Sequence, residues 1–405
     1  MSAVVRKKYL AFLKNWQDKA VIKVVSGVRR SGKSTLFDLF RQELYTQGIA
    51  ASQILNLNFE TRETRHIRKD VALENYIFEQ LDLNKKNYVF LDEIQMVHQF
   101  EHVINALFVE PNIDLYVTGS NAYFLSGEFA TLLSGRFVEL KILPLSFHEY
   151  VSWHQQHQLS KKHWTLAMYY EKYIKSTFPF TLNLENEGDI KTYLEGIYAS
   201  VVTKDVLTRQ NLSDVKTLDS TVQFLFSVIG SKISVNKIKN TLASNGNTVA
   251  HTTISKQLHG LKEALLFYPT RAYNIRGKKL LTREEKYYAV DVGLRQIVLP
   301  DAQPDSGHVL ENIIYLELLR RHGEVFTGKF DDLEIDFVIS KNGGFEYYQV
   351  ALSTLDEKTL ARELKPLQKL TNSYPKYLLT LDEIDKNTNY NGIQKRHALE
   401  WLMEV

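Results

Sequence analysis

Five short apolar runs separated by helical patterns constrain the fold of this chain more than any other feature. The runs are VIKVVSG (21–27), ILNLNFE (54–60), YVFLDEI (88–94), IDLYVTGS (113–120) and FVELKIL (137–143). The segments between them, and the first 20 residues, have the spacing of amphipathic helices. Runs that are apolar throughout are typical of parallel strands buried on both faces. The alternation therefore predicts an α/β fold in which helices cover both faces of a parallel sheet.

The rest of the chain predicts three further parts after an N-terminal domain of residues 1–150. Residues 151–220 are mostly helical in pattern and form a predicted connecting region. Residues 221–299 contain three helical segments followed by a short basic hairpin, which is the outline of a winged helix. A linker with two prolines then begins residues 300–405, where helices and strands predict a small separate α/β domain. A chain of 405 residues is long enough for several domains.

The composition excludes several kinds of site. The chain has no cysteine, which excludes disulfides, thiolate zinc sites and cysteine nucleophiles, and its histidines lack zinc-binding spacing. The net charge is only +3, so a protein-wide field for nucleic acid is not indicated, although local basic faces stay open. No apolar segment is long enough to cross a bilayer, and the charged N-terminus is unlike a secretory signal. We therefore expect a cytoplasmic protein without a membrane partner.

The segment between the first predicted strand and the next helix contains the phosphate-loop pattern G-x-x-x-x-G-K-S. Gly27 and Gly32 let backbone N–H groups curve around phosphate oxygens, and the following helix directs its positive end at the same oxygens. Lys33 supplies a positive charge to the β- and γ-phosphates, and the Ser34 hydroxyl is a predicted Mg²⁺ ligand. The predicted nucleotide-binding residues are Gly27, Arg29, Arg30, Ser31, Gly32, Lys33, Ser34 and Thr35. For the two arginines of the loop, exposure to solvent is an equal alternative.

Two acids end the third apolar run. A buried parallel strand delivers its last residues to the carboxyl edge of the sheet, where the phosphate loop also lies. Asp92 is therefore predicted to hold Mg²⁺ together with Ser34. Glu93 is predicted to orient and activate the attacking water. Taken alone, such a pair could equally cap a helix, but the upstream phosphate loop favours the catalytic interpretation.

Two further groups of catalytic candidates adjoin the fourth and fifth apolar runs. The fourth run ends in Thr118, Ser120 and Asn121, which could hydrogen-bond the attacking water or the γ-phosphate; an ordinary turn is the alternative. Arg136 precedes the last run, and an arginine at a domain edge can complete a neighbouring subunit's site and offset transition-state charge. A surface salt bridge is the alternative for Arg136.

These segments together resemble a known family. It comprises archaeal and bacterial AAA+-like ATPases that join a P-loop ATPase core, a winged helix and a C-terminal domain of uncharacterised function similar to the PD-(D/E)XK nuclease fold. The matching segments are GVRRSGKST, LNFE, VFLDEIQ, YVTGSNA, LSGRF, LPLSFHEY, VVTKDVL, KYYAVDVGL, LENIIYLEL and EIDFVI. LSGRF followed by LPLSFHEY is much more particular to this family than the phosphate loop is. The resemblance implies ATP binding, slow Mg²⁺-dependent hydrolysis and self-association into an oligomer.

The C-terminal segment departs from the nuclease pattern of that family. Members that keep the pattern have an acid on one strand and E-x-K on the next, so that two acids hold Mg²⁺ and the lysine assists the attacking water. Here Asp336 is present and Glu311 could add a carboxylate, but Gln349 and Ala351 stand at the E-x-K positions. Glutamine is a poor Mg²⁺ ligand compared with a carboxylate, and alanine has no nitrogen. We therefore expect a retained fold used for binding or assembly rather than for cleavage.

The predicted winged helix has residues suited to contact with DNA. Small polar residues at the start of its third helix could meet base edges or phosphates, and a basic hairpin could follow the backbone. The helix residues are Thr252, Thr253, Ser255, Lys256 and Gln257, and the hairpin residues are Arg271, Arg276, Lys278, Lys279 and Arg283. Alternatively, this part packs on the ATPase core and transmits its state.

Three functions are compatible with these features. The sequence favours a Mg²⁺-dependent ATPase, in which water attacks the γ-phosphate in line and hydrolysis moves the winged-helix and C-terminal parts. The first alternative is a nucleotide-gated DNA-binding or regulatory switch with little turnover. The second is an ATP-gated nuclease, against which Gln349 and Ala351 argue.

Overall fold

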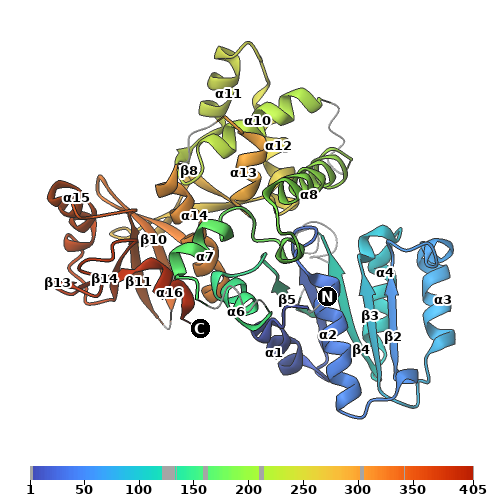
Figure 1. Ribbon diagram of the computed structural model, residues 1–405. Helices are drawn as coiled ribbons and strands as arrows, with labels where there is room; N and C mark the ends of the chain where they lie inside the picture. Colours follow the sequence, from blue (N-terminus) through green and yellow to red (C-terminus); the bar gives the residue numbers. More distant parts are fainter. Residues whose placement is uncertain are drawn as a thin grey trace. The chain divides into compact units, whose positions relative to one another are not determined.

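The computed structural model describes residues 3–120, 133, 135–157, 163–208, 214–301, 305–341 and 343–404, with side chains left out at 282–284 (Figure 1). The chain divides into two compact units. The first consists of Met1–Pro144 with Glu263–Leu265, and the second consists of Leu145–Lys262 with Leu266–Val405. The first unit thus ends at Pro144, close to the predicted boundary at residue 150.

The first unit is built on a five-stranded parallel sheet in the order β2-β3-β4-β1-β5. The strands are β1 (Ile22–Ser26), β2 (Ile54–Asn58), β3 (Asn87–Asp92), β4 (Ile113–Gly119) and β5 (Phe137–Lys141). Each strand corresponds to one of the five apolar runs, which confirms the predicted α/β sheet. The order places β4 between the strand that precedes the phosphate loop and the strand that ends in the two acids.

Helices cover both faces of this sheet (Figure 1). They are α1 (Lys7–Trp16), α2 (Lys33–Thr46), α3 (Asp70–Gln80) and α4 (Phe100–Val109). Successive residues of a strand point to opposite faces. Accordingly, Tyr88 and Phe90 of β3 belong to the core with α1 and α2, whereas Val89 and Leu91 belong to the core with α3 and α4. Two buried faces explain why the runs are apolar without alternation.

The second unit combines many helices with one large sheet. Its helices are α6 (Phe147–His157), α7 (Leu166–Tyr173), α8 (Glu187–Ser200), the π-helix η7 (Val201–Leu207), α10 (Val215–Ser227), α11 (Val235–Ser244), α12 (His251–Glu263), α13 (Gly293–Val298), α14 (Ser306–His322), α15 (Glu357–Gln368) and α16 (Ala398–Met403). Within the described ranges, no helix has both the length and the apolar character needed to cross a bilayer.

The nine strands of the second unit form one sheet in the order β13-β14-β12-β11-β10-β9-β7-β8-β6. They are β6 (Lys232–Ile233), β7 (Phe267–Asn274), β8 (Lys279–Ala289), β9 (Phe326–Phe330), β10 (Leu333–Lys341), β11 (Gly344–Val350), β12 (Lys376–Thr380), β13 (Asn389–Tyr390) and β14 (Ile393–His397). Three helices, α10 to α12, precede the β7–β8 hairpin, as the sequence predicts.

The predicted boundary between residues 299 and 300 does not separate two sheets. Strand β7 pairs with β8 on one side and, in parallel, with β9 on the other, from Ala272 with Thr327 to Asn274 with Lys329. The outer edge of an isolated hairpin would expose unpaired backbone groups. Here β9 satisfies those groups, so the hairpin and the C-terminal strands form one sheet.

Candidate phosphate-binding site

The phosphate loop connects β1 to α2 through backbone conformations that its glycines permit. Gly32 has φ +100° and precedes the first turn of α2. At Gly27, an added Cβ would lie 2.5 Å from the carbonyl oxygen of Ile142 and 2.8 Å from Ser31 Oγ. Only glycine avoids both the left-handed strain and the close approach, so the two glycines of the pattern have separate structural reasons.

Lys33 begins α2 and lies buried against the loop. Its ammonium donates hydrogen bonds to the carbonyl oxygens of Gly27 (2.9 Å) and Val28 (3.4 Å). The same Nζ lies 3.3 Å from Glu93 Oε1. The structure therefore brings together the loop lysine, which follows β1, and the predicted base, which follows β3.

Asp92 lies at the end of β3 in a network of polar side chains. Asn58 Nδ2 donates to Asp92 Oδ2 at 2.9 Å, and the Thr118 hydroxyl donates to Asp92 Oδ1. Burial raises the pKa of the Asp92 carboxyl above its ordinary value, although hydrogen bonds from Ser34 and Thr118 oppose the shift. The two predicted Mg²⁺ residues, Ser34 and Asp92, are therefore neighbours.

Glu93 follows in a left-handed backbone conformation with φ +56°. Its N–H donates to Thr118 Oγ1 at 2.9 Å, which holds the residue in this sparsely populated conformation. Burial alone would raise the pKa of the Glu93 carboxyl, but the charges of Lys33 and Arg29 outweigh it, so the pKa lies below its ordinary value. The lowered pKa favours the ionised form of this carboxyl.

Sequence reasoning missed Gln95, which contacts the predicted base. Gln95 Nε2 donates to Glu93 Oε2 and lies 3.4 Å from Ser120 Oγ. The structure thus places Ser120 within the site, whereas Asn121 lies outside the described residues. Thr118 Oγ1 contacts the backbone N–H of Glu93 and the carboxylate of Asp92, and its role toward water or the γ-phosphate stays a prediction. The VFLDEIQ segment contains Gln95, but no chemical rule singles out a glutamine two residues after an acid.

The remaining loop residues differ in their surroundings. Arg29 is partly buried, and its Nη1 lies 2.8 Å from Glu60 Oε1 just beyond β2. Arg30 is exposed, with φ +67°. Thr35, in the first turn of α2, is also exposed, as is its neighbour Ser34. The loop therefore presents a polar rim to solvent while Lys33 and Ser31 lie beneath it.

Arg136 lies at the opposite end of the sheet from the phosphate loop. Its backbone carbonyl accepts a hydrogen bond from Ile22 N (2.8 Å) at the start of β1, whereas the loop follows Ser26 at the end of that strand. At about 3.3 Å per residue, roughly 13 Å of strand separates the two ends. Its guanidinium donates to Asn105 Oδ1 at 2.6 Å. The structure thus does not bring Arg136 to the phosphate loop of its own chain, and only a neighbouring subunit's loop is open to it.

The site fits Mg²⁺ and a polyphosphate. Ser31 Oγ is buried and has no hydrogen-bond partner in the part of the chain that the structure describes. A buried hydroxyl without a partner is unfavourable, and a phosphate oxygen would supply the missing acceptor. Ser34 and Asp92 offer the hydroxyl and carboxylate oxygens that Mg²⁺ prefers. The backbone N–H groups at the start of α2 would add donors to phosphate oxygens.

The acids of the predicted nuclease-like site surround a lysine instead of an open space. Lys286 of β8 has its Nζ 3.0 Å from Glu311 Oε1 and 2.7 Å from Glu334 Oε1. Its distance to Asp336 Oδ1 is 3.7 Å. Tyr288 Oη donates to Glu311 Oε1 at 2.7 Å. Within the described ranges, no group of three or more His, Asp or Glu is arranged to hold a metal ion.

Gln349 is also tied into this region. Its Nε2 donates to Glu363 Oε2 at 2.9 Å, and its Oε1 accepts from the N–H of Asp336. Burial and the negative charge of Glu311 raise the pKa of the Asp336 carboxyl to about 8, although Lys286 opposes the shift. Burial would lower the pKa of Lys286, but its acidic neighbours, first Glu311 and then Asp336, raise it. The cluster thus has an internal cation in Lys286.

The predicted DNA-contact helix corresponds to α12, where one predicted residue is wrong. Thr252 and Lys256 are exposed. Gln257 is fully buried, and its Oε1 accepts a hydrogen bond from Thr221 Oγ1 at 2.7 Å. At helical spacing Gln257 lies on the same face as the buried Ile254, so it points into the core and away from a base edge.

The hairpin arginines are paired with acids of the C-terminal segment. Arg271 lies 3.1 Å from Glu324, and Arg276 lies 3.3 Å from Asp331. The side chain of Arg283 lies outside the described residues. The predicted basic hairpin is therefore partly neutralised by its own chain.

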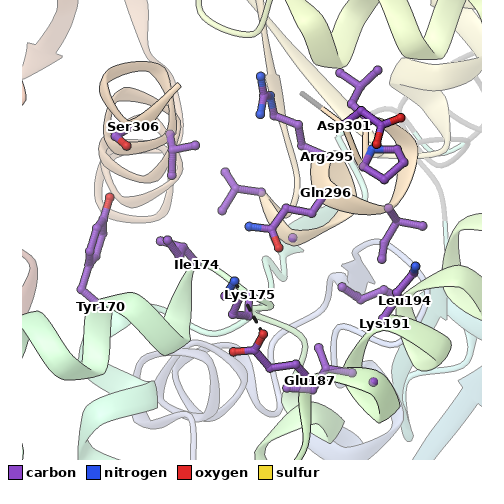
Figure 2. Close-up of a pocket in the computed structure, with 18 residues that line it drawn as sticks. Tyr170, Ile174, Lys175, Glu187, Lys191, Leu194, Arg295, Gln296, Asp301 and Ser306 are labelled. Atoms are coloured by element: carbon purple, nitrogen blue, oxygen red, sulfur yellow. Dashed lines mark ion pairs between the residues drawn. The ribbon is translucent and has the colours of Figure 1, made fainter. Parts of the chain in front are cut away.

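A cavity of about 670 Å³ lies in the second unit, between α7, α8, α13 and the start of α14 (Figure 2). Its wall combines apolar side chains such as Ile174 and Leu194 with the charged Lys175, Glu187 and Arg295. Lys175 and Glu187 form an ion pair at 3.8 Å. None of the described residues of the phosphate site lines this cavity, so it is separate from the proposed chemistry.

Comparisons with known proteins identify the kind of domain that contains the phosphate loop. A family model described as an AAA domain matches residues 19–151, which include the whole phosphate loop and both acids, and a domain of unknown function (DUF8612) matches residues 166–305. An uncharacterized protein of Haemophilus influenzae is 40% identical over 402 residues, covering 98% of each chain. The chain belongs to this family of AAA-type P-loop ATPases. The AAA-type P-loop part of the predicted resemblance is thereby confirmed.

The chain is also similar to an archaeal protein. An uncharacterized protein of Methanocaldococcus jannaschii is 28% identical over 392 residues, covering 92% of this chain and 83% of that protein. Among solved structures, a Walker-type ATPase of Pyrococcus abyssi has a TM-score of 0.52 and 15% identity, covering 73% of this chain and 95% of that one. At this identity the likeness concerns the fold alone, and it supports the P-loop architecture.

Proposed function

We propose that the protein binds ATP with Mg²⁺ at residues 27–35 and hydrolyses it by in-line attack of water on the γ-phosphate. The observation that carries this proposal is the 3.3 Å contact between Lys33 and Glu93, beside Asp92, whose neighbours include Ser34. Phosphoryl transfer needs little covalent chemistry from a protein; it needs positioned charges and an oriented nucleophile. This edge of the sheet has residues of the right kind for both.

Each residue has a distinct part in this proposal. The loop backbone and Lys33 bind the phosphate oxygens, and Ser34 and Asp92 would hold Mg²⁺. When bound, Mg²⁺ neutralises charge on the β- and γ-phosphates. Glu93, ionised because its pKa is lowered, orients the attacking water and accepts its proton. Ser120 faces the terminal phosphate.

Two finer parts of the proposal concern other surfaces. Arg136 acts on the phosphates of a neighbouring subunit, which requires a homo-oligomer, because in its own chain it lies at the far end of the sheet. The change from ATP to ADP alters the positions of the helical, hairpin and C-terminal parts. Removal of the arginine should then slow hydrolysis only at protein concentrations that allow assembly.

Steady-state phosphate release tests the proposed hydrolysis. Wild-type protein should release phosphate from ATP with Mg²⁺ and not with EDTA, and Glu93→Gln should be slower by about 10²–10⁴-fold while still binding ATP. Equal, slow release from both proteins with intact binding would refute catalysis and leave a nucleotide-gated switch.

DNA binding is a second candidate function, favoured by a positive charge concentrated in residues 231–280. Residues 231–280 contain nine Lys or Arg and one Asp or Glu, although the chain as a whole has a net charge of only +3. Three helices followed by a hairpin match the outline of a winged helix. Six exposed lysines form no ion pair with an acid among the described residues; they are Lys237, Lys239, Lys256, Lys262, Lys278 and Lys279. Phosphate contacts are therefore expected from these lysines more than from the paired arginines.

Fluorescence anisotropy with a labelled 20-base-pair duplex tests this candidate. Binding should weaken steeply between 50 and 200 mM salt, because displaced counterions drive it. The double variant Lys239→Glu with Lys256→Glu should bind at least about ten-fold more weakly, whereas Arg271→Glu, which removes a paired cation, should have a smaller effect. Absence of binding at 50 mM salt would remove the candidate.

A further inference from the structure

The proposed function leaves one conflict at Lys33. An ammonium group has three N–H donors. In this structure its neighbours are the carbonyl oxygens of Gly27 and Val28 and the carboxylate of Glu93. Lys33 therefore donates to two carbonyl oxygens and is ion-paired with a carboxylate, and a phosphate oxygen must compete with these partners. Both side chains of the ion pair are more than nine-tenths buried, so solvent screens their attraction little.

Glu93 is held at both of its oxygens. Lys33 contacts Oε1, and Gln95 Nε2 donates to Oε2. Gln95 also reaches Ser120 Oγ at 3.4 Å, which links the ends of β3 and β4. The Oε1 of Gln95 is buried and accepts no hydrogen bond in the described part of the chain. Oε1 of Glu93 thus contacts Lys33, a partner that a phosphate could take over. Oε2 accepts a hydrogen bond from Gln95, which lies only two residues further along the chain.

We propose that Glu93 and the terminal phosphate of the nucleotide compete for Lys33, and that Gln95 is a positioning residue that retains the carboxylate when the lysine moves. The proposal rests on the proposed function, because it requires the nucleotide at this loop. Binding of the phosphates draws Lys33 away and releases Oε1 of Glu93 to accept a proton from water. The base therefore becomes available only in the chain that has bound its substrate, and Gln95 keeps it aligned.

The competition makes a prediction about binding that does not depend on turnover. Any change that breaks the Lys33–Glu93 contact should tighten the binding of a nucleotide, because the phosphate no longer has to displace the carboxylate. Glu93→Asp keeps the charge but shortens the side chain by one methylene, and Glu93→Gln removes the charge. A hydrogen bond to a charged group contributes enough for about a ten-fold change in affinity.

Equilibrium titration with a fluorescent, non-hydrolysable ATP analogue and Mg²⁺ measures this effect. Glu93→Asp and Glu93→Gln should both bind about ten-fold more tightly than wild type. Glu60→Gln is the matched control, because Glu60 is an acid beside the same loop that pairs with Arg29 instead of Lys33. It should change affinity by less than about two-fold. Wild-type affinity in Glu93→Asp, or equal tightening in Glu60→Gln, would overturn the competition.

Turnover of a Gln95 variant tests the positioning role. Gln95→Met keeps the size of the side chain and removes its donor to Glu93. We expect kcat to fall about ten-fold with KM for ATP and analogue affinity unchanged, because the nucleotide does not touch this side chain. An unchanged kcat, or a parallel loss of affinity, would refute the role of Gln95.

The outcomes separate this proposal from the proposed function. If wild-type protein binds no analogue, both are wrong. If wild type binds and hydrolyses ATP but the Glu93 variants bind no more tightly, only the competition is wrong.

Discussion

Two buried lysines, Lys33 and Lys286, are similar in exposure and opposite in their surroundings. Their exposed fractions are 4% and 5%. Lys33 begins a helix and contacts two neutral carbonyl oxygens and one carboxylate. Lys286 lies within a strand and has three acidic side chains, those of Glu311, Glu334 and Asp336, within 3.7 Å.

The difference teaches which buried charge can serve a ligand. Hydrogen bonds from an ammonium to neutral carbonyls are weaker than ion pairs, so Lys33 can exchange them for phosphate oxygens at a moderate cost. Withdrawal of Lys286 would leave two buried acids, Glu311 and Asp336, without their cation, which is far more costly. The first lysine is therefore suited to binding and the second to holding the sheet and α14 together.

Removal of Lys286 should produce the largest effect on stability. Lys286→Met leaves its carboxylate partners unpaired in the interior, which costs about 3–5 kcal/mol of unfolding free energy. Urea denaturation measures the loss, and ATP turnover per folded molecule should stay unchanged. Lys278→Met, an exposed residue before the same strand, is the control and should change stability by less than about 0.5 kcal/mol. A loss below about 1 kcal/mol in the Lys286 variant would contradict the structural role.

Removal of Lys33 should instead lower ATP turnover. Lys33→Met should lower ATP turnover by at least about a hundred-fold, because it removes a charge directed at the phosphates. Phosphate release and analogue titration both measure it. If Lys33→Met and Lys286→Met reduced turnover equally, the distinction between the two lysines would be wrong.

A smaller effect is expected from crowding the phosphate loop. Gly27→Ala places a Cβ 2.5 Å from the Ile142 carbonyl, so the loop must shift away from it. Analogue affinity should fall by about ten-fold, equivalent to about 1.4 kcal/mol. Gly196→Ala is the control, since its Cβ would meet nothing within 4 Å and alanine favours its helix. Unchanged affinity in Gly27→Ala would show that the loop tolerates the shift.

The pH dependence of stability sharpens the comparison further. The pKa of Asp336 is raised from 3.8 to about 8, so the native state keeps a proton that the unfolded chain releases. Stability should therefore fall as pH rises between these values, by at most about 1.4 kcal/mol per pH unit. Asp336→Asn should flatten the slope between pH 5 and 8, as urea midpoints would show. Glu93→Gln should leave that slope in place, because the pKa of Glu93 is lowered instead.

Much of the phosphate site could be predicted because its chemistry depends on local spacing. Gly27, Lys33 and Ser34 are fixed relative to one another by one turn of loop and helix. Asp92 and Glu93 could be added because parallel strands end at one edge of a sheet. Gln95 could not, since no chemical rule singles out a glutamine two residues after an acid and only the structure shows its contact with Glu93.

Contacts between residues that are far apart in the sequence were harder to predict. Arg136 was predicted to act on a neighbouring subunit's phosphates, and the parallel register, which places it beside the start of β1 and away from its own loop, leaves that role a prediction. Gln257 was assigned to DNA, although the packing of α12 buries it. The loss of cleavage was predicted from Gln349 and Ala351. The cation that lies among the acids of this region, Lys286, comes from a strand more than fifty residues earlier in the chain.

By itself the sequence determined the parallel α/β core, the phosphate loop and the pair of acids, because the apolar runs and the G-x-x-x-x-G-K-S pattern act over a few neighbouring residues. Only the tertiary structure decided which partner each buried charge has. Strand order inserts β4 between β1 and β3, and β7 joins β9, so that residues far apart in the chain become neighbours. A buried charge is stabilised by whatever lies within a few ångströms, and that distance is set by packing instead of by spacing along the chain.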